Sequence, residues 1–102
     1  MKMIFMLTIW IPPDKGKEAM EKSMKIISAG MPKFIKKWQI YTTNDGLNGT
    51  KAYELIFTEK GRADEALLEI SKVIVPLAEI EGTRYKLETL FGMKDTIATL
   101  QP

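Results

Sequence analysis

The chain contains neither cysteine nor histidine. Without cysteine there can be no disulfide and no thiolate chemistry. Without histidine there can be no histidine general base, no Ser-His-Asp or Cys-His arrangement, no proximal-histidine haem and no histidine-ligated zinc. No apolar run approaches the about 20 residues that a membrane-spanning helix needs. The sequence therefore predicts no cofactor, no metal site and no membrane insertion.

The first eleven residues resemble a signal peptide only briefly. A lysine precedes an apolar run, but the run is short, has no small-residue cleavage site and leads directly into Pro12 and Pro13. We interpret it as a strand and expect a cytoplasmic protein. The length of 102 residues predicts one domain, with a core over 2–91 and a tail over 92–102. Abundant Lys and Glu with scarce Asn and Gln are also typical of thermophilic proteins.

Hydrophobic periodicity divides the chain into six elements. The expected strands cover 2–11, 34–43, 51–58 and 83–91, and the expected helices cover 14–30 and 62–75. Asp14 is the expected N-cap of the first helix, and Pro76 is expected to end or kink the second helix near Val75. This βαββαβ order predicts the α+β, ferredoxin-like arrangement, in which two helices cover one face of a four-stranded antiparallel sheet.

The expected first strand is apolar on both faces, which is typical of a central strand covered on both sides. One face carries Met3, Phe5, Leu7, Ile9 and Ile11, and the other carries Ile4, Met6, Thr8 and Trp10. Two helices can cover only one face of the sheet, so we expect a second copy of the sheet to cover the other. The lysine-rich first half and acid-rich second half are compatible with self-association, or with an uneven distribution of solvated charge.

Each expected helix carries an apolar stripe at helical spacing. The stripe of the first helix is Met20, Met24, Ile27 and Met31, and that of the second is Ala63, Leu67, Ile70, Ile74 and Leu77. We expect both stripes to face the core, although methionines can also form an adaptable binding surface. The tail, with Ile97 and Leu100, is expected either to fray or to dock on a partner subunit.

Strand parity predicts which side chains share the uncovered face. On the third strand we expect Tyr53, Leu55 and Phe57 to face the helices and Glu54 to face away. The candidate ligand-binding residues of the uncovered face are Thr8, Trp10, Gln39, Tyr41 and Lys86. Glu54 is the candidate catalytic acid or base, with a raised pKa unless it pairs with Lys37, Arg84 or Lys86. The alternative is a simple cross-strand pair between Glu54 and a lysine.

The layout resembles the dimeric α/β-barrel superfamily over 2–91, and particularly its small uncharacterised bacterial and archaeal members. The resemblance rests on the opening Met3-Ile4-Phe5-Met6-Leu7-Thr8-Ile9-Trp10-Ile11-Pro12-Pro13-Asp14-Lys15-Gly16-Lys17 and on Lys36-Lys37-Trp38-Gln39-Ile40-Tyr41. Relatives include cofactor-independent monooxygenases, muconolactone isomerases, chlorite-dismutase-like haem enzymes and Lrp-type regulators. The absent histidine separates this chain from the haem enzymes, and no catalytic motif of the others is present. The resemblance therefore implies a sheet-to-sheet dimer and leaves the activity open.

Two functions fit these observations. The first is a homodimer, or a higher homo-oligomer, that binds a small apolar or aromatic molecule between its sheets without catalysis. The alternative is a cofactor-independent monooxygenase- or isomerase-like enzyme with Glu54 as acid or base. We expect no nucleic-acid partner, because the chain has two arginines and its lysine cluster at 33, 36 and 37 is short.

Overall fold

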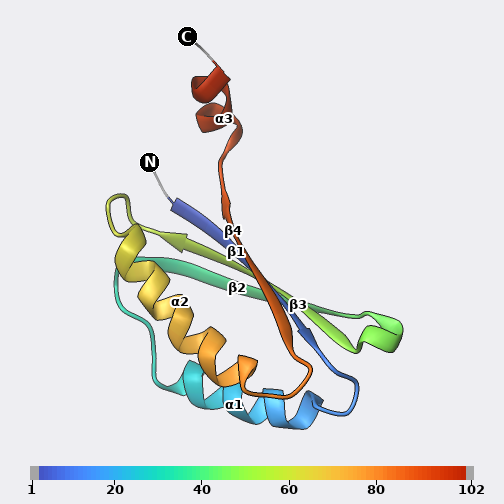
Figure 1. Ribbon diagram of the computed structural model, residues 1–102. Coiled ribbons are helices and arrows are strands. Elements are labelled where there is room, and N and C mark those ends of the chain that lie inside the picture. The colour runs from blue at the N-terminus through green and yellow to red at the C-terminus, as the bar shows by residue number, and fades with distance from the viewer. Residues whose placement is uncertain (1–2, 101–102) are drawn as a thin grey trace.

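The computed structural model describes residues 3–100. The strands are β1 (Met3–Ile11), β2 (Ile35–Asn44), β3 (Thr50–Thr58) and β4 (Arg84–Leu90), and the helices are α1 (Gly16–Ser28), α2 (Ala63–Ala78) and α3 (Met93–Leu100). The strands form one antiparallel sheet in the order β2-β3-β1-β4, and α1 and α2 lie on one side of it (Figure 1). This arrangement confirms the predicted ferredoxin-like βαββαβ fold.

The core lies between the sheet and α2. Leu7 is fully buried at the centre of β1, and Phe5 and Ile9 beside it on the same face are almost as buried. Ile70, Ile74 and Leu77 of the predicted α2 stripe belong to the same core cluster, but Leu67 is exposed. Ala66 and Val73, which were not part of the predicted stripe, are buried beside them. β1 pairs with β3 on one side and β4 on the other, which confirms its predicted central place.

The orientation predicted for β3 was wrong. Ala52, Glu54, Ile56 and Thr58 are the buried residues of this strand. In the β1–β3 register Leu7 lies opposite Glu54, and directly opposed residues of antiparallel strands point to the same face. Glu54 therefore faces the helices, and Tyr53, Leu55 and Phe57 face the other way. The prediction chose the face with the larger apolar side chains, Tyr53, Leu55 and Phe57. In the structure the helices instead cover the face with the smaller side chains, which include Ala52 and Thr58.

The first helix also differs from its prediction. It begins at Gly16 rather than Asp14, and the residue preceding it, Lys15, makes no side-chain capping hydrogen bond. Ala19 is its only buried residue. The four stripe residues expected in the core are instead 55–62% exposed, and they are Met20, Met24, Ile27 and Met31. The helix packs against the core through Ala19 and the half-buried Ile26, which leaves the methionine stripe exposed.

The second helix continues through Pro76 to Ala78, so it does not end near Val75, which was one of the two predicted outcomes. Proline removes one backbone hydrogen bond and typically costs a helix interior about 3 kcal/mol. Here Ile74 and Leu77 are buried on either side of it, and their packing holds the last turn in place. The Lys22 ammonium of α1 donates a 3.1 Å hydrogen bond to the Pro76 carbonyl, which ties the two helices together.

The β2–β3 connection is a tight turn that includes a single turn of 3-10 helix at Gly46–Asn48. Gly49 follows it with a φ of +85°. A Cβ at this position would lie 2.0 Å from the Ile11 carbonyl oxygen and 2.7 Å from the Pro13 nitrogen. Only glycine fits here, because the turn passes directly over the end of β1.

The segment expected to fray or dock forms α3, a helix that extends beyond the end of the sheet and away from α1 and α2 (Figure 1). Its larger apolar side chains, Met93, Ile97 and Leu100, are exposed, as is Phe91 before it. Met93, Ile97 and Leu100 recur at positions i, i+4 and i+7, which places them on one side of the helix. Within residues 3–100, no helix is both long and apolar enough to cross a membrane.

Candidate functional site: the open face of the sheet

The candidate site is the face of the sheet that α1 and α2 do not cover, called the open face below. The strand registers place sixteen side chains on it. They are Ile4, Met6, Thr8 and Trp10 of β1, Lys37, Gln39, Tyr41 and Thr43 of β2, Lys51, Tyr53, Leu55 and Phe57 of β3, and Arg84, Lys86, Glu88 and Leu90 of β4. The five predicted ligand-binding residues are all among them.

One half of the open face is apolar. Ile4 lies between Phe57 and Leu90, and Met6 lies opposite Leu55. All five of these side chains are only half-buried in the single chain. Contiguous apolar surface is typical of places where another protein or a ligand packs.

The other half combines aromatic rings with cations. The Lys51 ammonium lies 5.2 Å from the centroid of the Trp10 ring and 4.9 Å from that of Tyr53. The guanidinium carbon of Arg84 lies 5.7 Å from the Trp10 centroid, from the opposite neighbouring strand. These distances suit cation–π attraction. A side-chain hydrogen bond with Tyr53 raises the pKa of Lys51, so the ammonium remains charged at neutral pH.

Thr8 joins the two halves. It is 3% exposed even though no helix covers it, and it lies between Tyr53 and Lys86 in the two registers. The Lys86 ammonium lies 3.7 Å from the Glu88 carboxylate on the same strand. Lys86 is therefore a cation of the open face that has a carboxylate partner on the same face.

The remaining two predicted residues come from the edge strand β2. Gln39 lies opposite Leu55, and Tyr41 lies opposite Tyr53. Tyr41 is exposed, and it extends the aromatic half of the face toward the edge of the sheet. Lys37, further along the same strand, places its ammonium 5.9 Å from the centroid of the Phe57 ring.

Glu54 does not belong to the open face. It is 5% exposed on the helix side, where the Trp38 indole nitrogen donates a 2.7 Å hydrogen bond to its Oε1 atom. Burial raises the pKa of this carboxyl, and the hydrogen bond from Trp38 opposes part of that effect. None of the predicted lysine or arginine partners pairs with it, because they all lie on the other side of the sheet. A catalytic role for Glu54 in a cavity between two open faces has no support from this geometry.

Sequence reasoning missed two residues of the aromatic and cationic cluster, Lys51 and Tyr53. Both are on β3, whose orientation was predicted wrongly, so they were expected on the helix side or left unassigned. The ferredoxin-like order does place β3 beside β1. Only the register, however, brings Lys51 opposite Trp10 and Tyr53 opposite Thr8.

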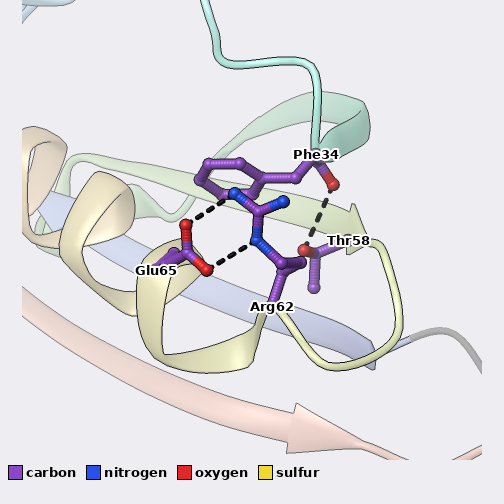
Figure 2. Close-up of polar contacts among 4 residues, drawn as sticks. All are labelled: Phe34, Thr58, Arg62 and Glu65. Carbon is purple, nitrogen blue, oxygen red and sulfur yellow. Dashed lines mark hydrogen bonds and ion pairs between the residues drawn. The ribbon is translucent and has the colours of Figure 1, made fainter.

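A second surface feature lies on the helix side, where β3 leads into α2. Arg62 makes a two-pronged ion pair with Glu65, with both contacts at 2.6 Å, and its guanidinium carbon lies 4.5 Å from the centroid of the Phe34 ring (Figure 2). The Thr58 hydroxyl donates a 3.2 Å hydrogen bond to the Phe34 carbonyl. This cluster fastens the chain before β2 to the start of α2.

A groove of about 660 Å³ continues from this cluster along α2. Four of its lining residues are polar or charged, and the other four are Phe34, Leu68, Val75 and Pro76. It is open to solvent, so it lacks the enclosure typical of a small-molecule site. Residues 3–100 contain no group of three or more acidic side chains placed to hold a metal ion.

No protein-family model matches this chain, and no curated protein sequence matches it. Solved structures do match its fold. A dimeric ferredoxin-like protein from an uncultured marine organism has a TM-score of 0.64 at 8% identity, over 90% of this chain and 94% of its own. The de novo designed protein Foldit4 has a TM-score of 0.56 at 5% identity, over 90% of this chain and 99% of its own. The chain has a ferredoxin-like fold.

Proposed function

We propose that this chain is a homodimer of the dimeric α/β-barrel kind, which binds a small apolar or aromatic molecule between the open faces of its two sheets without catalysing a reaction. The observation that supports this most strongly is the apolar half of the open face, formed around Ile4, Met6, Leu55 and Phe57. Two sheets that pack face to face lie about 10 Å apart and bury such side chains between them.

Two further observations support self-association. The structural neighbour with a TM-score of 0.64 is itself described as dimeric. One side of α3 also exposes the apolar side chains of Met93, Ile97 and Leu100. Because β4 ends the open face at Leu90 and α3 follows at Met93, α3 lies next to the proposed interface.

A cavity requires that the two faces do not fill the space between them completely. The open face mixes long side chains such as Trp10 and Lys86 with the short side chains of Thr8 and Thr43. Polar groups from Gln39 and Tyr41 beside this surface could orient a ligand. This mixture suits a lined cavity better than a dry interface.

The proposal is tested by the mass of the chain in solution. Sedimentation equilibrium at micromolar concentration should give a dimer. Leu55→Lys places a charge in the centre of the apolar half, and we expect it to yield a monomer. Leu68→Lys is the matched control, since Leu68 is exposed on α2 on the other side of the molecule. A monomeric wild-type chain, or a Leu55→Lys variant that remains dimeric, would contradict the proposed interface.

Ligand binding is tested separately by native mass spectrometry of untagged protein taken directly from cells. A dimer that carries a reproducible small-molecule adduct supports the cavity. The mass of that adduct also begins to identify the ligand. The adduct should be absent from the Thr8→Trp variant, because a larger side chain at the centre of the open face fills the proposed cavity. The Leu68→Lys control should retain the adduct.

A further inference from the structure

We propose that the molecule bound between the open faces is a small organic anion, an aromatic or aliphatic carboxylate whose charge is held by Lys51 and Arg84 beside Trp10. This inference rests on the proposed function, because it requires the two open faces to enclose a cavity. Beyond the proposed function, it specifies the charge of the ligand and the position of its charged end in the cavity.

The first support is the charge of the open face. It carries four cations, Lys37, Lys51, Arg84 and Lys86, and one carboxylate, Glu88, for a net charge of +3. The side of the sheet that the helices cover carries the single carboxylate Glu54 on its paired positions. Two open faces brought together would therefore concentrate positive charge in one interface, and charges removed from water require compensation.

The second support is that the two cations beside Trp10 lack carboxylate partners. Lys86 has Glu88, but neither Lys51 nor Arg84 has a carboxylate within 4.0 Å among the described residues. Both are held instead against the Trp10 ring, one from β3 and one from β4. A ligand anion placed there would supply the missing charge, and arginine and lysine form strong charge-assisted hydrogen bonds with carboxylates.

The third support is the position of the apolar half. Trp10 and Met6 lie on the same face of β1, four residues apart, which corresponds to about 13 Å along an extended strand. A molecule with a carboxylate at one end and an apolar ring or chain directed along β1 would place its charge at the cations and its apolar part toward Met6. Its apolar part would then contact Met6 and Leu55, and its charge would lie between Lys51 and Arg84.

The test compares two probes that differ only in charge, 1-naphthaleneacetate and its neutral amide, 1-naphthaleneacetamide. Binding to the full chain is measured by titration calorimetry at low salt, with the mass of the protein determined in the same buffer. We expect the acid to bind at least about ten-fold more tightly than the amide, as one charge-assisted contact provides. The preference should diminish with added salt, because the cations are partly exposed.

Variants locate the charged end. Lys51→Gln and Arg84→Gln should each reduce the preference for the acid, and the double variant should remove it. Lys37→Gln is the matched control, since it removes the same charge from the same face, beside Phe57 rather than Trp10. Circular dichroism and thermal melting confirm that each variant is folded.

The outcomes separate this inference from the proposed dimer. A dimer that binds acid and amide equally, or binds neither up to millimolar concentration, overturns the anion and leaves the dimer standing. A preference for the acid that survives the double variant overturns the assignment to Lys51 and Arg84. A monomer that binds a ten-nucleotide oligothymidylate in place of the acid overturns both, in favour of a nucleic-acid platform.

Discussion

The two faces of this sheet are built from the same strands and are used differently. On the helix side, Phe5, Leu7 and Ile9 of β1 are buried against α2, and the one carboxylate has a hydrogen-bond donor, Trp38. On the open face, the neighbouring residues of the same strand are Ile4, Met6, Thr8 and Trp10. Trp10 lies beside Lys51 and Arg84, which have no carboxylate within 4.0 Å among residues 3–100. The comparison shows that burial within one chain completes the first face and leaves the second only partly covered.

The largest difference between the faces should appear when the same substitution is made on each. Leu7→Ala removes a fully buried side chain on the helix side and should lower the free energy of unfolding by about 2–5 kcal/mol. Leu55→Ala on the open face should act mainly through the dimer. Urea unfolding at several protein concentrations measures both, because only a loss of association depends on concentration.

If the two faces were alike, the Leu7→Ala effect would also vary with protein concentration. A Leu55→Ala loss that is independent of concentration and as large as that of Leu7→Ala would show that β3 is covered on both sides within one chain. Either result would remove the distinction between a completed face and an open one.

The next effect concerns the buried carboxylate. Trp38→Phe keeps an aromatic ring but removes the donor to Glu54, and it should cost about 1–3 kcal/mol at neutral pH. The cost should fall at acidic pH, where Glu54 is protonated. Trp10→Phe is the corresponding change on the open face, and we expect no such pH dependence from it. Urea unfolding at neutral and acidic pH checks the difference.

Glu54→Gln should have a smaller effect and the opposite sign. Burial raises the folded-state pKa of Glu54 above its ordinary value of 4.5, so the folded chain holds this proton more tightly than the unfolded chain. The stabilisation from protonated Glu54 is therefore complete below the unfolded-state pKa and is lost as the pH rises through the higher folded-state value. At neutral pH, we expect Glu54→Gln to match or exceed the wild-type stability by on the order of 1 kcal/mol.

The readout is the unfolding free energy as a function of pH from below 4.5 to neutral. The wild-type curve should fall across this window relative to that of Glu54→Gln. Glu81→Gln, a change at an exposed residue, is the control and should follow the wild type. A wild-type curve that rises relative to Glu54→Gln would mean that the carboxylate is better stabilised by the fold than its hydrogen bond to Trp38 indicates.

The smallest effect is expected outside both faces, at the Arg62–Glu65 pair of Figure 2. Both side chains are substantially exposed, so solvent screens their attraction. We expect the midpoint of thermal unfolding of Glu65→Gln to equal that of the wild type within measurement error, even though the ion pair is short and two-pronged. A clear loss of stability would show that the stacking of Arg62 on Phe34 depends on this carboxylate.

Local patterns predicted a large part of the fold. The alternation within β1 identified a central strand, and three residues of the predicted α2 stripe, Ile70, Ile74 and Leu77, lie in the core. Parity also grouped Thr8, Trp10, Gln39, Tyr41 and Lys86 on one face, because side chains alternate along every strand. The two sets within each strand follow from neighbouring residues alone, whereas the grouping of residues from different strands also relied on the predicted ferredoxin-like order of the strands.

The errors share a different cause. The predicted stripe of Met20, Met24, Ile27 and Met31 satisfied the helical period, yet α1 packs on the core through Ala19 and Ile26. Pro76 was expected to end or kink α2, yet the helix continues to Ala78 with buried neighbours on both sides of the proline. In both cases packing against distant residues outweighed a local preference. The helix over Met93–Leu100 was not predicted, because its short apolar pattern is also typical of a frayed tail.

The sequence by itself determined the order of the elements, the central place of β1 and the two sets of residues on each strand. Only the tertiary structure decided which set of β3 turns inward. Alternation defines two faces without naming the buried one, and a shift of one residue in the register exchanges them. The register that pairs Leu7 with Glu54 turns the Glu54 set toward the helices. The same register places Lys51 and Tyr53 beside Trp10 on the open face.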